Sequence, residues 1–592
     1  MKTILIALVA ISAFISCSNP KETKMENSNA ELDSLLHEYY EERLKLFPLE
    51  ATGIADNRYN DTLPVDISDS YRSILRNFFT TYGEKFSKID RAKLSGQSIL
   101  SFDVMQYEMD MQVKGLSFND NLMPVNQFWS MHLTFPVLGS GSGNQPFKTV
   151  KDYDDFLGRI HDFTSYVDTM ISNMKRGMSQ GIVQSKVLME KVLPQLEGII
   201  VKDPMQSVFA GPIKNFPADF SEQEKTRLTE LYKSAIMNEV VSSYKKLHSF
   251  IKKDYLPVCR ATTGISEVPG GKEMYAYLAK FWTTTDLTPD EIYAIGESEV
   301  ARIRSEMERV KTETGFKGTL KEFFHFIHTD KQFMPFKQDS DVINAYRAIE
   351  TKMQPQLKKL FNLVPKAKFE VRQTEAFREA SASAEYQQSA PDGSRPGIFY
   401  VPVLDPTKFN NVSMEDLFLH EAIPGHHYQT SIQQENKDLP DFRRFGWYGA
   451  YGEGWALYTE SLGKELGLYT DPYQYFGALS EEMHRAIRLV VDVGMHMKGM
   501  TREQAIAYSL ENETESEADI TAEVERYMAI PGQALSYKIG QMKIQELRAK
   551  AEKKLGTKFN IKAFHDEVLI NGCLPLAIFE REVDRWIDAG GS

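Results

Sequence analysis

The sequence predicts a mainly α-helical protein with one small β element. Apolar residues recur at helical spacing from Leu32 to Leu44, and Pro48 ends that segment. Thr288-Pro289-Asp290-Glu291 is a capping box with proline at the first helical position, and apolar residues follow it along one face as far as Val310. A β-type run is found from Ile398 to Val403. We therefore expect a large helical body with a short strand.

The N-terminus predicts an exported protein. Lys2 precedes Ile4 to Ile15, an apolar run of about a dozen residues, which is too short to span a bilayer but is typical of a signal peptide. The run ends in Ala13-Phe14-Ile15-Ser16-Cys17, which resembles a bacterial lipoprotein signal with Phe14 in place of the usual Leu. This resemblance implies a signal peptide over residues 1–16, lipidation of Cys17, and anchoring on the periplasmic or cell-surface side of the envelope. The alternative is a buried thiol in an N-terminal helix.

The remaining chain shows no clean division into domains. Residues 17–30 are polar and predict a flexible tether. Residues 31–592 show no composition change that cuts them, although an N-terminal subdomain over about 31–270 and a catalytic part over about 271–592 are expected. We therefore prefer a single large helical body.

Composition and missing motifs exclude several classes of function. Apolar residues make up 42% of the chain and charged residues 26%, which is ordinary for a globular protein. The 69 basic and 82 acidic residues give a net charge of −13, which argues against nucleic acid as a partner. The chain lacks G-x-S-x-G, G-x-x-x-x-G-K-[ST] and G-x-G-x-x-G, so serine hydrolase, nucleotide and dinucleotide functions lack their usual signals.

Three of the twelve histidines fall within eight residues, His420 to His427. In an ordinary zinc-peptidase helix the second His follows the first by four residues, but Pro424 occupies that position here. On a regular helix His426 would lie about 240° around and about 9 Å along from His420, and His427 would be nearly eclipsed but about 10 Å away. Pro424 removes a backbone donor and Gly425 relaxes the chain, so a widened or broken turn could bring His426 opposite His420. We favour His426 as the second ligand and leave His427 open.

Four segments together resemble a known family: HEAIPGHHYQ, EGWALYTE, RLVVDVGMH and ERYMAIPGQALSYKIG. They resemble the DUF885 proteins, which are bacterial, often lipoproteins, and proposed metallopeptidases. The resemblance extends over most of the mature chain. It implies a mostly helical fold like that of the gluzincin carboxypeptidases and oligopeptidases, which hold zinc with two His and one Glu, and a small β element beside the active-site cleft.

A third ligand is expected from a separate helix, and Glu453 is our choice. It lies 27 residues after His426, and its Glu-Gly-aromatic-Ala context resembles the third-ligand helix of gluzincins. Glu460, seven residues on, could instead orient a ligand. Leu457 stands where gluzincins have an acidic residue four positions after the ligand, which leaves open which group orients the ligands. The expected cofactor is one Zn²⁺ per chain, with Glu421 as the general base.

Several side chains that we expect to contact the substrate lie in the segments after Glu460. His484, Arg488, Asp492 and His496 are spaced four apart in an apolar context, so they form one polar stripe on a helix. Either Arg488 pairs internally with Asp492, or Arg488 clamps a substrate carboxylate and His496 supports the oxyanion.

Resemblance to gluzincins makes Tyr537 the favoured transition-state donor, with packing as the alternative. Arg526, His427 and Tyr400 complete the candidate substrate-binding set. Tyr400 belongs to the β-type run, which Pro402 restricts to an edge strand or a strand end. An edge strand can hold an extended peptide by main-chain hydrogen bonds.

The resulting hypothesis is zinc-dependent hydrolysis of peptide bonds in short peptides by a lipid-anchored carboxypeptidase or oligopeptidase. Exopeptidase and endopeptidase activity are both left open. The competing hypothesis is a lipid-anchored protein that binds peptides or metal without turnover.

Overall fold

The computed structural model describes residues 20–375, 379, 383–391, 393 and 395–591. Helices account for 69% of the chain and the sheet has three strands, which confirms the mainly α fold class. The predicted signal peptide and Cys17 lie outside the described residues. None of the described helices is both long enough and apolar enough to cross a membrane.

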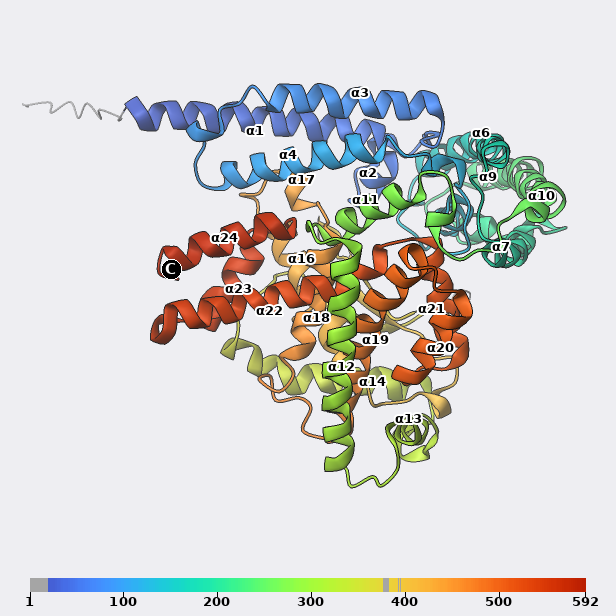
Figure 1. Cartoon of the computed structure of the whole chain (residues 1–592). Helices are drawn as coiled ribbons and strands as arrows, with labels where there is room; N and C mark the ends of the chain where they lie inside the picture. The colour runs from blue at the N-terminus through green and yellow to red at the C-terminus, as the bar shows by residue number, and fades with distance from the viewer. Residues whose placement is uncertain (1–19, 376–378, 380–382, 392, 394, 592) are drawn as a thin grey trace, which may run out of the picture.

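The N-terminal helices form a layer along the top of Figure 1. They are α1 (Pro20–Leu46), α2 (Pro48–Gly53), α3 (Asp69–Phe86) and α4 (Gln97–Gly115). Helix α1 begins at Pro20, so the prediction of a tether is wrong for residues 20–30. Proline suits the start of a helix, and the Lys, Glu and Met residues that follow are good helix formers. Asn29 also forms two hydrogen bonds with Ser95, of 2.9 and 3.1 Å.

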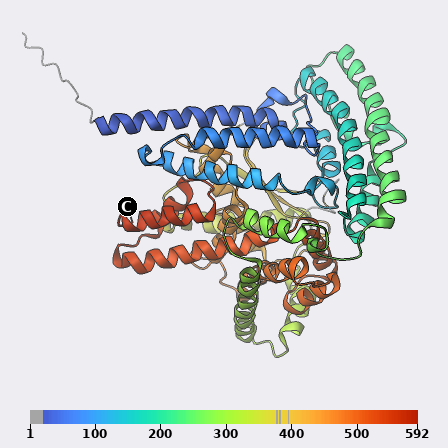
Figure 2. The same cartoon turned by 45° about the horizontal axis from the view of Figure 1, so that its top comes forward.

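A second group of helices stands at one end of this layer (Figure 2). It comprises α5 (Met131–Gly139), α6 (Val150–Gln180), α7 (Lys186–Ile199), α8 (Gly211–Lys214), α9 (Glu222–Ala235) and α10 (Val241–Phe250). These helices share a hydrophobic core drawn from residues between Leu63 and Tyr255. Leu100 and Val104 of α4 instead pack into the core of the C-terminal part. The division near residue 270 stays a prediction.

The C-terminal helices surround the site. They are α11 (Gly271–Thr283), α12 (Pro289–Glu313), α13 (Leu320–Thr329), α14 (Asp339–Met353), α15 (Met414–Glu421), α16 (His426–Glu435), α17 (Asp441–Arg444), α18 (Gly449–Ser461), α19 (Pro472–Met497), α20 (Arg502–Asn512), α21 (Glu517–Ala529), α22 (Ser536–Leu555), α23 (Ile561–Ile570) and α24 (Leu576–Asp588). Helix α12 starts with the predicted capping box between Thr288 and Glu291 and packs along α19. Helix α22 packs along α18.

The sheet has the strand order β1-β3-β2. Strand β1 (Phe369–Gln373) runs parallel to β3 (Gly397–Val401), and β2 (Glu385–Gln387) runs antiparallel to β3. Strand β3 is therefore central and fully buried, and it ends before Pro402, so the strand-end alternative was correct and the edge alternative was wrong. Strand β2 is an edge strand and lines the cavity that Glu421, Glu453 and Tyr537 also line. We call it the catalytic cavity, after the role that we propose for it below.

Candidate metal centre

Three ligand atoms converge between α15, α16 and α18. One nitrogen or oxygen atom from each of His420, His426 and Glu453 lies within 4.8 Å of the others. His426 Nε2 is 3.4 Å and His420 Nε2 is 3.8 Å from Glu453 Oε2. Zinc binds imidazole nitrogen and carboxylate oxygen at about 2.0–2.2 Å, so small shifts would place all three atoms around one ion. Two imidazoles and a carboxylate are a donor set that suits Zn²⁺.

The charges at the centre fit a bound cation. Burial lowers the pKa of His420, but contacts with Glu453 and Glu460 outweigh it and raise the pKa to about 10. Burial acts to raise the pKa of Glu453, but the two imidazoles lower it well below its usual range. The carboxylates therefore favour positive charge at the position that a metal ion would occupy.

A break in the helix brings the two imidazoles together. Helix α15 ends at Glu421 and α16 begins at His426, so residues 422–425 form an irregular turn. A Cβ atom on Gly425 would lie 1.9 Å from the carbonyl oxygen of His420, and therefore only glycine fits this close approach. Trp455 Nε1 donates a 2.8 Å hydrogen bond to the carbonyl of Pro424 and holds the turn against α18. The expected distortion between Ile423 and Gly425 is present.

The same turn directs His427 away from the centre. Its Nδ1 lies 2.8 Å from the hydroxyl of Tyr386, and its ring packs on Phe369. His427 is buried and is absent from the described wall of the catalytic cavity. His427 is therefore placed neither as a metal ligand nor in contact with a substrate in that cavity, so its assignment to the substrate set is corrected.

Contact between two glycines sets the position of Glu453. A Cβ atom on Gly454 would lie 2.4 Å from the carbonyl carbon of Gly540, so α18 and α22 cross with their backbones touching. Glu460 lies two helical turns after Glu453, and its Oε1 is 2.6 Å from His420 Nδ1. This contact leaves His420 Nε2 free for a metal, which is the orienting role considered for Glu460.

Glu421 lies directly beside the ligand triad. It is 8% exposed and lines the catalytic cavity, and burial is the main cause that raises its pKa. A buried carboxylate next to a metal ligand can accept a proton from a water molecule and pass it to a leaving group.

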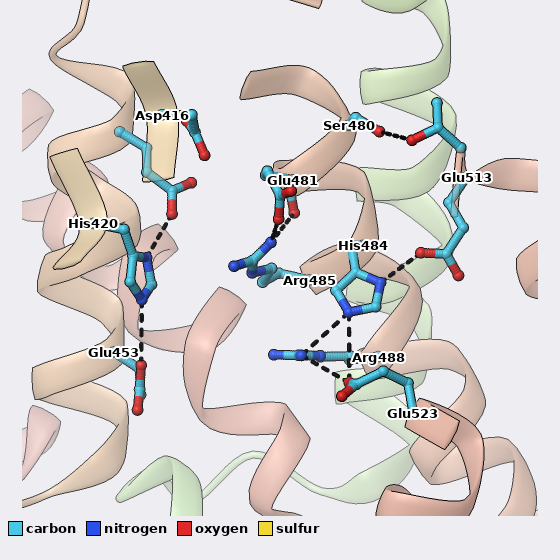
Figure 3. A network of polar contacts seen from close by, with 12 residues as sticks. Asp416, His420, Glu453, Ser480, Glu481, His484, Arg485, Arg488, Glu513 and Glu523 are labelled. Atoms are coloured by element: carbon cyan, nitrogen blue, oxygen red, sulfur yellow. Dashed lines mark hydrogen bonds and ion pairs between the residues drawn. The ribbon is translucent and has the colours of Figure 1, made fainter. Parts of the chain in front are cut away.

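The catalytic cavity has a volume of about 640 Å³ and extends from the triad to α19, α21 and α22. Figure 3 shows Arg485 and Arg488 projecting from α19 into the space that faces His420 and Glu453. Arg488 Nη2 lies 2.9 Å from Glu523 Oε2, and Arg526 Nη1 lies 3.1 Å from Glu523 Oε1. One carboxylate therefore holds both guanidinium groups at the cavity wall.

Tyr537 also lines this wall. Its hydroxyl accepts hydrogen bonds from Arg526 Nη2 at 3.2 Å and Gln533 Nε2 at 3.4 Å. The guanidinium of Arg488 lies 4.5 Å from the centre of the Tyr537 ring. Because both neighbours donate to its oxygen, the hydroxyl hydrogen of Tyr537 is available to a ligand.

Two predicted site residues lie outside the cavity wall. His496 is fully buried: its Nδ1 accepts from the Ile265 amide at 3.0 Å and its Nε2 lies 3.0 Å from the Tyr527 carbonyl. It therefore does not support an oxyanion. Tyr400 is 7% exposed in β3, between Arg372 and Glu385 of the flanking strands, and is not among the described residues that line the cavity.

The internal Arg488 to Asp492 pair is also absent. Asp492 accepts from the Tyr275 hydroxyl at 2.5 Å and from the Gly532 amide at 3.1 Å. The first half of the polar stripe on α19 thus faces the cavity, and the second half enters the core.

Sequence reasoning missed Arg485, Glu481 and Glu523. Glu481, Arg485 and Arg488 follow one another at helical spacing, so the periodicity that identified the stripe could have found them. Glu523 comes from α21 and carries no such signal, because its partners lie on another helix.

The His496→Ala variant should lose stability while the group formed by His420, His426 and Glu453 stays in place. The Ile265 amide and the Tyr527 carbonyl would lose buried partners, at a cost of about 2–4 kcal/mol. Burial lowers the pKa of His496 to about 3, from an ordinary value of 6.5. Below pH 6.5 the unfolded chain therefore binds a proton that the native chain excludes, so the native state loses up to ~1.4 kcal/mol per pH unit through this group.

The variant has no imidazole to protonate at this position. The difference in free energy of unfolding between the unaltered protein and the variant should therefore become smaller from pH 7.5 to pH 5, as measured by urea denaturation. A variant with unchanged stability at pH 7.5 would contradict the structural role.

Comparisons with known proteins agree with the fold. The family model described as "Bacterial protein of unknown function (DUF885)" matches residues 48–583. The solved structure of a candidate lipoprotein from Colwellia psychrerythraea is 29% identical, with a TM-score of 0.88 over 95% of this chain and 99% of that chain. A candidate lipoprotein of unknown function from Shewanella oneidensis is 18% identical and shares the fold, with a TM-score of 0.71 over 93% of this chain and 99% of that chain. No curated protein matches the chain.

Proposed function

The chain belongs to the DUF885 family, and from the metal centre of this member we propose that it is a zinc-dependent peptidase acting on short peptides. The observation that carries this proposal is the convergence of His420, His426 and Glu453 beside the buried carboxylate of Glu421 in one cavity. Zinc bound by such residues acts as a Lewis acid that polarises a carbonyl group and lowers the pKa of water.

The chain's own residues supply the proton transfers. Glu421 accepts a proton from the attacking water and then delivers it to the leaving amine. Glu460 keeps His420 in the orientation that presents Nε2 to the metal position. The Tyr537 hydroxyl donates to the carbonyl oxygen as negative charge develops on it.

The guanidinium groups favour a substrate that carries a carboxylate. Arg488 is 5% exposed and lines the cavity, and its Nη1 is buried with no hydrogen-bond partner among the residues described. Arg488 and Arg526 share one Glu523, so these three side chains together carry one net positive charge. A peptide C-terminus would pair with it, which supports a carboxypeptidase or an oligopeptidase.

An extended peptide is supported by strand β2. It pairs with β3 on one side, and its residues Glu385 and Tyr386 line the cavity. Main-chain groups of an edge strand can hold a peptide backbone. The likeness to candidate lipoproteins supports export, and we propose that Cys17 carries the lipid anchor on the periplasmic or cell-surface side.

The test is hydrolysis of a mixed peptide library by the zinc-loaded protein, read as product masses. Hydrolysis should stop with 1,10-phenanthroline and return when zinc is added, and the masses identify the bond that is cut. Stoichiometric zinc with no cleavage of any peptide would instead favour a binding protein without turnover. Protein that binds no zinc would overturn the metal centre itself.

A further inference from the structure

A second cavity lies next to the catalytic cavity and shares part of its wall with it. It has a volume of about 540 Å³, within the range of pockets that bind small ligands, and we call it the second chamber. Its walls come from α1, α2 and α4 and from the segment between α17 and α18. Figure 1 shows this N-terminal layer lying over α17. The N-terminal helices therefore form part of a cavity next to the metal centre.

The two cavities adjoin each other and share part of their walls. Tyr386, Gln388 and Trp447 line both of them. The Trp447 ring lies 5.8 Å from the His426 ring, and a Cβ atom on Gly452 would lie 2.2 Å from it. Trp447 is thus seated against α18 beside the ligand Glu453, and it is still 43% exposed. Trp447 and β2 therefore lie at the boundary between the metal centre and the second chamber.

The chemistry of the second chamber differs from that of the catalytic cavity. Its wall includes seven aromatic side chains, namely Tyr39, Tyr40, Tyr386, Phe442, Phe445, Trp447 and Tyr448. Its described charged residues are two carboxylates and two guanidinium groups, and Arg43 lies 2.8 Å from Glu50 and 3.6 Å from Glu108. The described wall of the catalytic cavity carries seven carboxylates and three guanidinium groups. An aromatic wall whose charges balance suits an apolar or aromatic side chain.

We propose that the second chamber binds the part of a peptide substrate that extends past the metal centre and selects aromatic or large aliphatic side chains there. This inference rests on the proposed peptidase function. The peptide backbone runs along β2, the outer strand of the described sheet, whose residues line both cavities. Dipeptides fill the catalytic cavity alone, whereas longer peptides reach the second chamber and gain binding energy from it.

Gly53→Trp tests this directly. Gly53 lies at the end of α2 on the wall of the second chamber, and a Cβ atom there meets nothing within 4 Å. The indole would occupy the chamber with little steric cost to the fold. Gly198→Trp is the matched control, because Gly198 also lies near a helix end with an open Cβ position and lines neither cavity.

The readout is kcat/KM for peptides that share one cleavage site and are extended, at either end, by residues ending in Phe or in Gly. For one of the two ends, the unaltered protein should prefer the Phe extension by about 10-fold to 100-fold, the range expected for burial of one large apolar side chain. Gly53→Trp should reduce that preference to less than about threefold, and Gly198→Trp should keep it. Equal rates for both extensions at both ends, or a preference that survives Gly53→Trp, would overturn the inference.

A binding experiment tests this inference separately from the peptidase proposal. Calorimetric Kd values for the same peptides are measured on Glu421→Gln, with and without Gly53→Trp. If no peptide is cleaved by the unaltered protein, the peptidase proposal fails, and the Phe-over-Gly difference in Kd still decides whether the second chamber binds peptide. Equal Kd values with and without the indole would reject the chamber as a peptide site, whatever the outcome of the cleavage assay.

Discussion

Glu421→Gln should abolish peptide turnover and leave the zinc content unchanged. A general base typically contributes about 10²-fold to 10⁴-fold in rate, so kcat should fall by that amount. The amide matches the carboxylate in size but cannot take up the proton of water. Because Glu421 is not one of the three converging ligands, metal binding should persist. The measurements are kcat on the best library peptide and zinc per chain by elemental analysis.

Glu460→Gln is the matched control for this prediction. Glu460 contacts His420 Nδ1, so its replacement should weaken zinc binding by about 10-fold to 100-fold, as found for similar outer contacts. Excess zinc should restore turnover in Glu460→Gln and should not restore it in Glu421→Gln. Restoration in both variants would mean that Glu421 acts through the metal and not as the base.

His426→Ala should lose the metal, whereas His427→Ala should keep it. Removal of His426 leaves two ligands at the centre, so zinc should fall well below one per chain and turnover should drop to background. His427 lies against Tyr386 and Phe369, so its removal should cost about 1–3 kcal/mol of stability through the lost hydrogen bond. Adjacent substitutions thus separate metal binding from folding.

Zinc per chain, turnover per zinc and urea denaturation are measured on both variants. Full zinc occupancy in His426→Ala with loss of zinc in His427→Ala would reverse the assignment of the ligands.

Local patterns in the sequence predicted much of the fold and part of the site. The capping box at Thr288 and the apolar periodicity after Leu32 are contained within single helices, and both helices are present. Pro424 and Gly425 predicted the break that brings His426 to His420, because proline and glycine change the backbone conformation at their own positions in the chain.

The errors concern side chains whose partners are distant in the chain. His496 accepts a hydrogen bond from the amide of Ile265, which is 231 residues away in the chain. No residue spacing on α19 could reveal that contact. The edge strand β2 has three residues, too few for a β pattern to be recognised. The second chamber combines α1 with the segment before α18, so it exists only once the N-terminal layer has packed on the C-terminal part.

The widened turn between α15 and α16 has a consequence for annotation. His420 and His426 are separated by five residues, whereas motif scans for zinc peptidases expect three. Such scans therefore do not select this chain. A pattern of His-Glu-x-x-Pro-Gly-His, with Glu-Gly-Trp beginning 27 positions after the last His, would retrieve the chains that have adopted this longer arrangement.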